Sequence, residues 1–255
     1  MKIAICMSGH FRLAHYSSRQ NEWFYDLLKN SGNDVDIFLH TWSDKKRVLL
    51  TDHLYQFTKM HIDNNPPQTP TWWGQWISFN RCLDLVNKSD KDYDVVIRAR
   101  PDNLIFKSDY HDDINALLDN VVNNNLLLTD SVWGKNEVLH IQDQLFISRY
   151  DVCNSMFNLD NVMSVVSKSK KDKKINPVST LGYLMQNFDF KNTQVKSGTY
   201  LNYFKQKLCR PPHLEIDPQL LKYKQAREIY LNYKKERQQL KDHMAQNTYK
   251  DWIDE

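Results

Sequence analysis

Two arginines and an aspartate, Arg98, Arg100 and Asp102, follow one another closely in the middle of the chain. The residues before them, 95–97, read Val-Val-Ile and predict a buried strand, which Pro101 ends because proline has no N–H for the ladder. Side chains alternate along a strand, so both arginines are expected on one face of the sheet. Arginine is a permanently charged, forked donor that suits phosphate, and the group therefore predicts an anion site.

A structural role for the two arginines is the alternative. Both can be half-buried partners of nearby carboxylates such as Asp94 or Asp109. Desolvating two guanidinium groups on one face is costly, which favours an anionic ligand over this arrangement.

Polar side chains also follow the two apolar runs that predict strands near the start of the chain. Ser8, His10 and Arg12 come after the first run, and a His-Thr-Trp triplet at 40–42 comes after the second, residues 35–39. The carboxyl ends of parallel strands lie at one edge of a sheet, where open α/β sheets bind ligands. We therefore expect these side chains to converge with the two arginines.

Segments of helical periodicity separate these strands. Residues 20–29 and 71–86 each carry one apolar stripe, whereas residues 43–68 are polar and predict irregular structure. The strand–helix–strand order predicts an α/β fold with a mostly parallel, Rossmann-like central sheet flanked by helices. Further predicted elements are a helix over 115–122, strands over 126–128 and 145–147, and a helix over 177–188.

Composition excludes several classes of function. The 255 residues include only six glycines, against roughly 18 at average usage, and these are too far apart for a dinucleotide or P-loop fingerprint. The four cysteines form no CxxC pair, so a zinc or dithiol motif is not expected, and Cys6 and Cys82 are predicted to be small buried hydrophobes. A net charge of +3 does not indicate a nucleic-acid binder. The scattered cysteines fit a reducing cytoplasm, and no apolar run is long enough for a membrane span, so a cytoplasmic protein is expected.

Residues 1–212 are predicted to be one catalytic domain, followed by a basic helical extension over 213–255. The division follows Pro211 and Pro212, after which the chain becomes rich in lysine. A basic amphipathic helix can lie on an anionic membrane surface, which would make the protein peripheral on the inner face of a membrane. The alternative is a solvated helix that packs on the domain or on a second subunit.

The sequence resembles bacterial and viral nucleotide-sugar-dependent glycosyltransferases of the GT-A type, from families that build capsule and lipopolysaccharide. The stretches that carry the resemblance are, in order, KIAICMSGHFR, DVDIFLHTW, a helix beginning near Gln75, YDVVIRARPDNLIF and IQDQLFIS. They cover roughly residues 1–150, and NPVSTLGYLMQ and QKLCRPP match more weakly.

The resemblance implies a nucleotide held at the first strand by Ser8 and His10, and a diphosphate beside the strand that ends in the family's metal-binding Asp-x-Asp. Here that motif reads Arg100-Pro101-Asp102, so one of the two carboxylates is missing. Asp102 would hold Mn²⁺ or Mg²⁺ with phosphate oxygens and water. Alternatively, Arg98 and Arg100 would neutralise the leaving diphosphate without a metal.

Asp143 lies where similar enzymes carry a carboxylate that faces the acceptor, and the resemblance makes it the candidate catalytic base. Alternatively, Asp143 has a structural role, as a helix N-cap or as a carboxylate that stabilises a loop. Inverting and retaining chemistry are both open.

The function expected from these features is transfer of a sugar from a nucleotide-sugar donor to a surface polysaccharide or lipopolysaccharide, a glycan or glycolipid acceptor. Arg12, Arg98, Arg100 and Asp102 would manage the phosphates. Two alternatives are a non-catalytic nucleotide- or carbohydrate-binding module of the same fold, and another transferase, such as a sulfotransferase or phosphotransferase, with an anionic donor.

Overall fold

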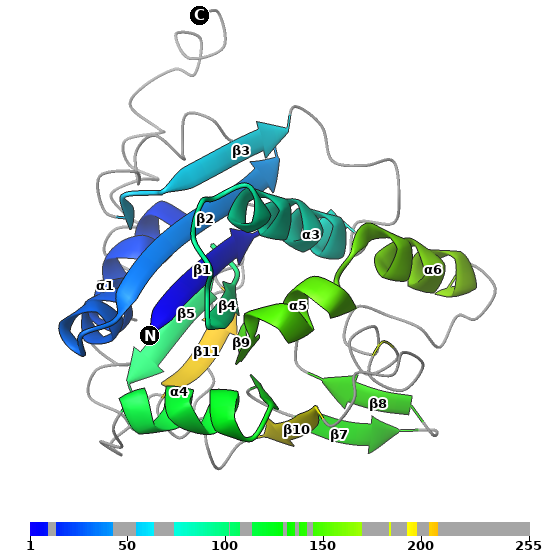
Figure 1. The fold of residues 1–255 in the computed structure, drawn as a ribbon. Coiled ribbons are helices and arrows are strands. Elements are labelled where there is room, and N and C mark those ends of the chain that lie inside the picture. Colours follow the sequence, from blue (N-terminus) through cyan, green and yellow to red (C-terminus); the bar gives the residue numbers. More distant parts are fainter. Residues whose placement is uncertain are drawn as a thin grey trace, which may run out of the picture. The chain divides into compact units, whose positions relative to one another are not determined.

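The computed structural model describes residues 1–9, 14–42, 55–63, 74–101, 103–107, 114–129, 132–135, 138–141, 145–169, 184, 193–197 and 204–208. The backbone groups into two compact units, Met1–Pro212 and His213–Glu255. The described residues all belong to the first unit (Figure 1). The basic helical extension predicted for 213–255 and the helix predicted for 177–188 lie outside them, apart from Leu184.

A seven-stranded sheet with the order β10-β6-β9-β4-β1-β2-β3 forms the centre of the fold. Its strands are β1 (Lys2–Ser8), β2 (Asp34–Trp42), β3 (Lys59–Asp63), β4 (Val95–Ala99), β6 (Leu126–Thr129), β9 (Leu145–Arg149) and β10 (Gln194–Ser197). Only β9 among these strands runs antiparallel to its neighbours β4 and β6. The predicted α/β class with a mostly parallel sheet is confirmed.

One of these strands corrects the sequence analysis. β3 lies within residues 43–68, for which irregular structure was predicted, and it pairs in parallel with β2. Residues 59–63 read Lys-Met-His-Ile-Asp, an alternation typical of an edge strand with one half-exposed face. The strand adds polar side chains to the carboxyl end of the sheet.

Two small antiparallel sheets accompany the central one. β5 (Asn103–Lys107) pairs with β11 (Phe204–Leu208), although almost a hundred residues separate them in the sequence. β7 (Val132–Lys135) and β8 (Val138–Ile141) form a hairpin.

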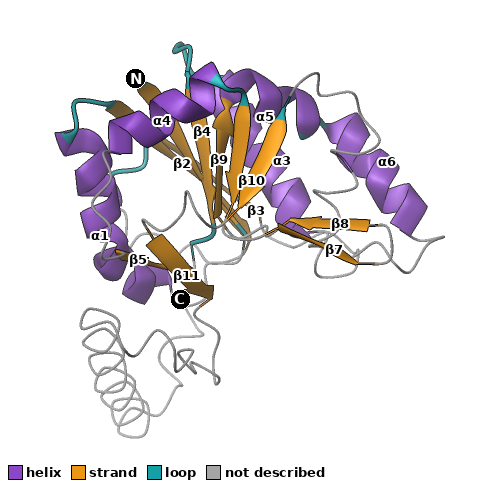
Figure 2. Cartoon of the chain, turned by 90° about the horizontal axis from the view of Figure 1, so that it is seen from below, coloured by secondary structure: helices purple, strands orange, loops and turns teal. Residues whose placement is uncertain are grey.

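Helices cover both faces of the central sheet (Figure 2). The described helices are α1 (Ala14–Asn30), α3 (Gly74–Asn87), α4 (Ile114–Asn123), α5 (Tyr150–Met156) and α6 (Leu159–Ser169). Side chains of α1 and α4 share one core cluster with the sheet, and those of α3, α5 and α6 share the other. We call the two sides of the sheet the α1 face and the α3 face. None of the described helices combines the length and the apolar character that crossing a membrane requires.

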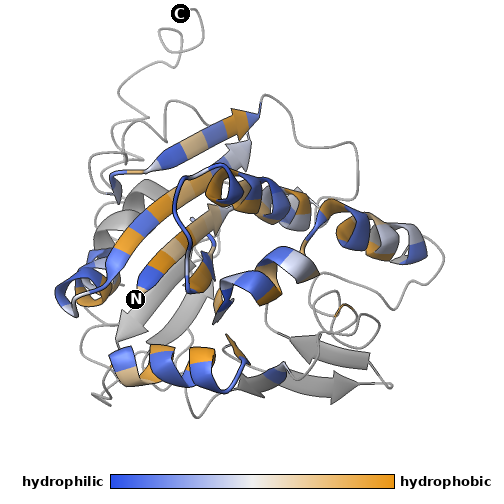
Figure 3. Ribbon diagram, viewed as in Figure 1, coloured by the Kyte–Doolittle hydropathy of each residue, from blue (hydrophilic) through white to orange (hydrophobic). Residues whose placement is uncertain are grey.

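Side-chain alternation assigns each strand residue to one face. Ile3, Ile5 and Met7 of β1 pack on the α1 face, and Ala4 and Cys6 pack on the α3 face. Figure 3 shows the apolar colouring of β1 and the mixed colouring of β3. Cys6 and Cys82 are buried free thiols, which confirms their predicted role as small core residues. By the same alternation, Ser8 of β1 and His40 of β2 lie on the α3 face.

Candidate functional site

The strand register brings three polar residues into a row at the carboxyl end of the sheet. Ser8 of β1 is the partner of His40 in β2, and His40 is the partner of His61 in β3. Ser8 and His40 are fully buried, whereas more than half of the His61 side chain is exposed. The row therefore runs from the interior of the sheet to its exposed edge.

Ser78 of α3 connects this row to the end of β1. Its Oγ accepts a hydrogen bond from the Gly9 N–H at 2.9 Å and donates to the His40 carbonyl oxygen at 3.0 Å. The same Oγ lies 2.8 Å from Nδ1 of His40. Gly9 has a φ of 122°, a conformation that favours glycine and that turns the chain where β1 ends. A buried hydroxyl thus fixes the orientation of the His40 ring.

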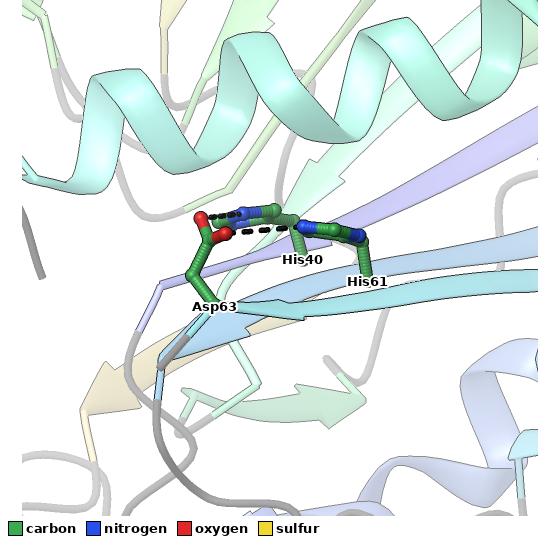
Figure 4. A group of neighbouring side chains, drawn as sticks. All are labelled: His40, His61 and Asp63. Carbon is green, nitrogen blue, oxygen red and sulfur yellow. Dashed lines mark hydrogen bonds and ion pairs between the residues drawn. The ribbon is translucent and has the colours of Figure 1, made fainter. Parts of the chain in front are cut away.

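Asp63 of β3 binds the other side of this ring (Figure 4). Its two carboxylate oxygens contact the Nε2 atoms of His40, at 3.0 Å, and of His61, at 3.1 Å. The two imidazole rings stack with their centroids 5.7 Å apart. Arg81 of α3 forms an ion pair with the same carboxylate, and its guanidinium lies 5.3 Å from the centre of the Trp42 ring. These residues make a compact polar cluster at the ends of β2 and β3.

Burial, with the charge of Arg81 and the neighbouring His61 adding to it, lowers the pKa of His40 to about 3. The ring is therefore neutral at pH 7 and carries one proton. With the proton on Nε2 it donates to Asp63, and with the proton on Nδ1 it donates to Ser78. Both tautomers have a partner in place.

Arg98 is buried more deeply than the sequence suggested. Its side chain is fully buried on the α3 face, where its guanidinium carbon lies 4.7 Å from the Trp76 ring centre, 5.5 Å from Phe79 and 5.9 Å from Phe146. A cation over aromatic faces is stabilised by the ring quadrupoles. The interior of the α3 face thus holds a positive charge below the carboxyl edge.

Arg100 lies just beyond β4 and is partly exposed. Its Nη1 donates to Oε1 of Gln75 at 3.4 Å, so it reaches the first turn of α3. Because Arg98 also contacts α3, the prediction that the two arginines share a face is confirmed. Asp94, one of the carboxylates considered as a partner, instead accepts a hydrogen bond from the Lys2 N–H at 2.8 Å.

Four of the predicted site residues lie outside the described residues: His10, Arg12, Asp102 and Asp143. The metal expected at Asp102 and the base expected at Asp143 therefore stay predictions. Sequence reasoning missed His61, Asp63 and Arg81. The alternation over 59–63 carried a signal for the first two, since it places His61 and Asp63 on one face of a strand.

Comparison with models of known protein families finds no match, and comparison with curated protein sequences finds none either. Solved structures do show similarity. The galactosyltransferase LgtC, in complex with donor and acceptor sugar analogues, is 13% identical, with 76% of this chain and 73% of that chain covered and a TM-score of 0.48.

Two further structures are similar over most of their length. A putative glucose-1-phosphate thymidylyltransferase from Bacillus anthracis is 10% identical, with coverage of 82% and 89% and a TM-score of 0.45. A glycosyltransferase involved in glycosylation of the major capsid of PBCV-1 is 12% identical, with coverage of 77% and 82% and a TM-score of 0.42.

Proposed function

We propose that the chain is a glycosyltransferase that uses a nucleotide-diphosphate sugar as donor and a glycan or glycolipid as acceptor. The observation that carries the proposal is the gathering of polar groups at one edge of a parallel sheet. Ser8 ends β1 there, His40 lies beside it near the end of β2, and Arg100 follows β4. This edge is where open α/β sheets bind nucleotides. The resemblance of the sequence adds the sugar donor and a surface polysaccharide or lipopolysaccharide as acceptor.

Arg100 is the described residue best suited to contact the diphosphate. Its guanidinium is partly exposed at the carboxyl edge and is oriented by Gln75. Two oxygens of a phosphate group accept parallel hydrogen bonds from such a fork, and the charge that develops on the leaving group is stabilised in place. Arg12 and Asp102 complete the phosphate site in this proposal, and His10 contacts the nucleotide.

Arg98 and Ser8 act from below the surface. Both are fully buried, so neither presents its side chain to solvent in this structure. A positive charge in a low-dielectric interior is screened less than one at the surface, so Arg98 raises the potential at the edge above it. We assign Arg98 this electrostatic role and Ser8 the support of the nucleotide loop that follows it.

A divalent cation at Asp102, Mn²⁺ or Mg²⁺, would neutralise charge on the diphosphate when bound. Asp102 lies outside the described residues. Arg100 and the buried Arg98 supply positive charge to the same edge from the chain itself.

Binding and turnover test the proposal separately. The full chain is titrated with nucleoside diphosphates and assayed for donor hydrolysis and transfer over a panel of nucleotide sugars. We expect Arg100→Gln to weaken nucleoside diphosphate binding roughly 10- to 100-fold, the loss of one charged hydrogen-bonding group. Arg149→Gln is the matched control, because Arg149 is a partly exposed arginine at the end of β9, opposite the amino end of β4, and it pairs with Asp151.

Each result has a distinct reading. Binding without turnover of any donor favours the non-catalytic module over the enzyme. Equal binding by the two arginine variants and the parent removes Arg100 from the site, and no binding of any nucleotide overturns the proposal.

Asp143 has its own test within the proposed reaction. Asp143→Asn removes the candidate base and should lower turnover by roughly 100-fold or more, the usual contribution of general base catalysis. Donor affinity should stay close to that of the parent. Unchanged turnover would show that another group accepts the proton of the acceptor.

A further inference from the structure

Three side chains of metal-ligating type face one another at the exposed end of the candidate site. Ligand atoms of His40, His61 and Asp63 all lie within 4.8 Å of one another (Figure 4). We propose that these three residues bind a divalent transition-metal ion of the Zn²⁺ type. The proposal concerns residues other than Asp102 and does not depend on the proposed glycosyl transfer.

The strand register positions the three ligands before any ion arrives. His40 and His61 are partners in neighbouring parallel strands, and Asp63 follows His61 by two residues on the same face. Each Nε2 lies 3.0–3.1 Å from a carboxylate oxygen. In a tetrahedral zinc site with bonds of about 2.0–2.1 Å, neighbouring ligand atoms are roughly 3.3 Å apart. Small side-chain movements are therefore enough to enclose an ion.

The hydrogen bonds behind His40 suit a ring that binds metal through Nε2. Such a ring carries its proton on Nδ1, and that N–H donates to Ser78 Oγ over the observed 2.8 Å. Ser78 then donates its own proton to the His40 carbonyl oxygen, at 3.0 Å, and still accepts from the Gly9 N–H. Every polar group in this chain of bonds is satisfied, and Nε2 keeps a lone pair for the metal.

The donor set indicates which ion binds. Two imidazole nitrogens and one carboxylate suit Zn²⁺ and its neighbours, whereas Mg²⁺ prefers oxygen ligands and retains its water. More than half of the His61 side chain is exposed, so an ion can enter from solvent and a water can provide a fourth ligand.

Arg81 competes with the ion. Its guanidinium forms an ion pair with the Asp63 oxygen that also contacts His40. The arginine side chain is 42% exposed and its guanidinium already lies over the Trp42 ring, so it can release the carboxylate without losing every contact. Removing its charge should therefore tighten metal binding, an effect that a purely structural ion pair would not produce.

The experiment is a zinc titration of the full chain by competition with a chromophoric chelator. The variants are His61→Gln and Arg81→Gln, and Glu22→Gln is the control, an exposed carboxylate on α1. We expect His61→Gln to weaken zinc binding by roughly tenfold or more. Arg81→Gln should strengthen it several-fold, Glu22→Gln should leave it unchanged, and Mg²⁺ should not compete. His61 and Arg81 are both partly exposed, so these variants should fold, which circular dichroism checks.

Zinc should also raise the thermal midpoint of the parent more than that of His61→Gln, since an ion that binds only the folded chain stabilises it. The proposal is wrong if the parent binds no zinc. It is equally wrong if His61→Gln binds zinc with the affinity and stoichiometry of the parent, because the ion is then held by other residues.

Discussion

The α1 face and the α3 face of the central sheet are both buried but differ in chemistry. The core cluster on the α1 face consists of hydrophobic residues from β1, β2, β4, β6, β9, α1 and α4, together with Tyr55. The α3 face has its own hydrophobic cluster, to which the strands add buried polar residues: Ser8, His40, Arg98, Thr129 and Ser148. Thr41 is the exception, a buried polar strand residue that alternates with His40 and so lies on the α1 face.

This difference separates the parts of the fold that stabilise it from the parts that can do chemistry. Burying a polar group costs free energy unless the group forms a hydrogen bond. A face of only apolar residues therefore stabilises a sheet without that cost. The α3 face bears that cost, and its carboxyl half contains the His40 network and both central arginines. We therefore expect substitutions on the α1 face to change stability, and substitutions at the carboxyl half of the α3 face to change binding as well.

The largest effect is expected from Ile97→Ala. Ile97 precedes Arg98 in β4 but packs on the α1 face, where it is fully buried. The cavity left behind should lower the free energy of unfolding by about 2–5 kcal/mol, measured by urea denaturation. Nucleoside diphosphate affinity of the folded variant should match that of the parent. If Ile97→Ala instead lost much of its nucleoside diphosphate affinity and kept the free energy of unfolding of the parent, the two faces would not differ in function as stated.

An intermediate effect is expected from Ser78→Ala. The substitution removes the partner of the buried His40 ring and one of the two acceptors of the Gly9 N–H, which keeps the His40 carbonyl oxygen at 3.2 Å, and it should cost about 1–3 kcal/mol. Zinc affinity should fall too, because the ring loses the group that orients it. Ser148→Ala is the control, a buried serine on the same face near the amino end of β4, whose hydroxyl lies against Cys153. Equal losses in the two variants would show that Ser78 has no special role.

The smallest effect is expected at the other end of β2. Burial would raise the pKa of Asp36, but hydrogen bonds from Lys91, Tyr93 and Thr58 outweigh it, and the pKa lies below its usual value. A lowered carboxyl pKa stabilises the fold above the ordinary pKa near 4, and the contribution disappears as pH falls. Asp36→Asn should therefore cost up to about 1 kcal/mol at pH 7 and less at pH 3, measured by denaturation at both values. A cost that does not change with pH would contradict this origin.

Much of the sheet could be predicted from the sequence. The apolar runs of β1, β2 and β4 are short, nearly continuous and ended by turn residues or proline, as buried parallel strands require. The shared face of Arg98 and Arg100 followed from alternation alone. β3 was missed because only Met60 and Ile62 of its five residues are apolar, a weak signal within a polar segment.

The polar cluster needed the tertiary structure. His40 and His61 are neighbours only through the pairing of β2 with β3, and Arg81 reaches Asp63 only because α3 packs across both strands. The complete burial of the Arg98 side chain could not be predicted from the sequence either, because the aromatic rings around it come from α3 and β9. Spacing along the chain shows neither of these contacts.

A crystal structure of the chain with a nucleoside diphosphate and Mn²⁺ tests the central claim most directly. We expect the diphosphate at the carboxyl ends of β1, β2 and β4, on the side covered by α3 and within hydrogen-bond distance of Arg100. A nucleotide bound at the amino edge near Asp36 and Lys91, or on the α1 face, would contradict the assignment of the carboxyl half of the α3 face as the functional site.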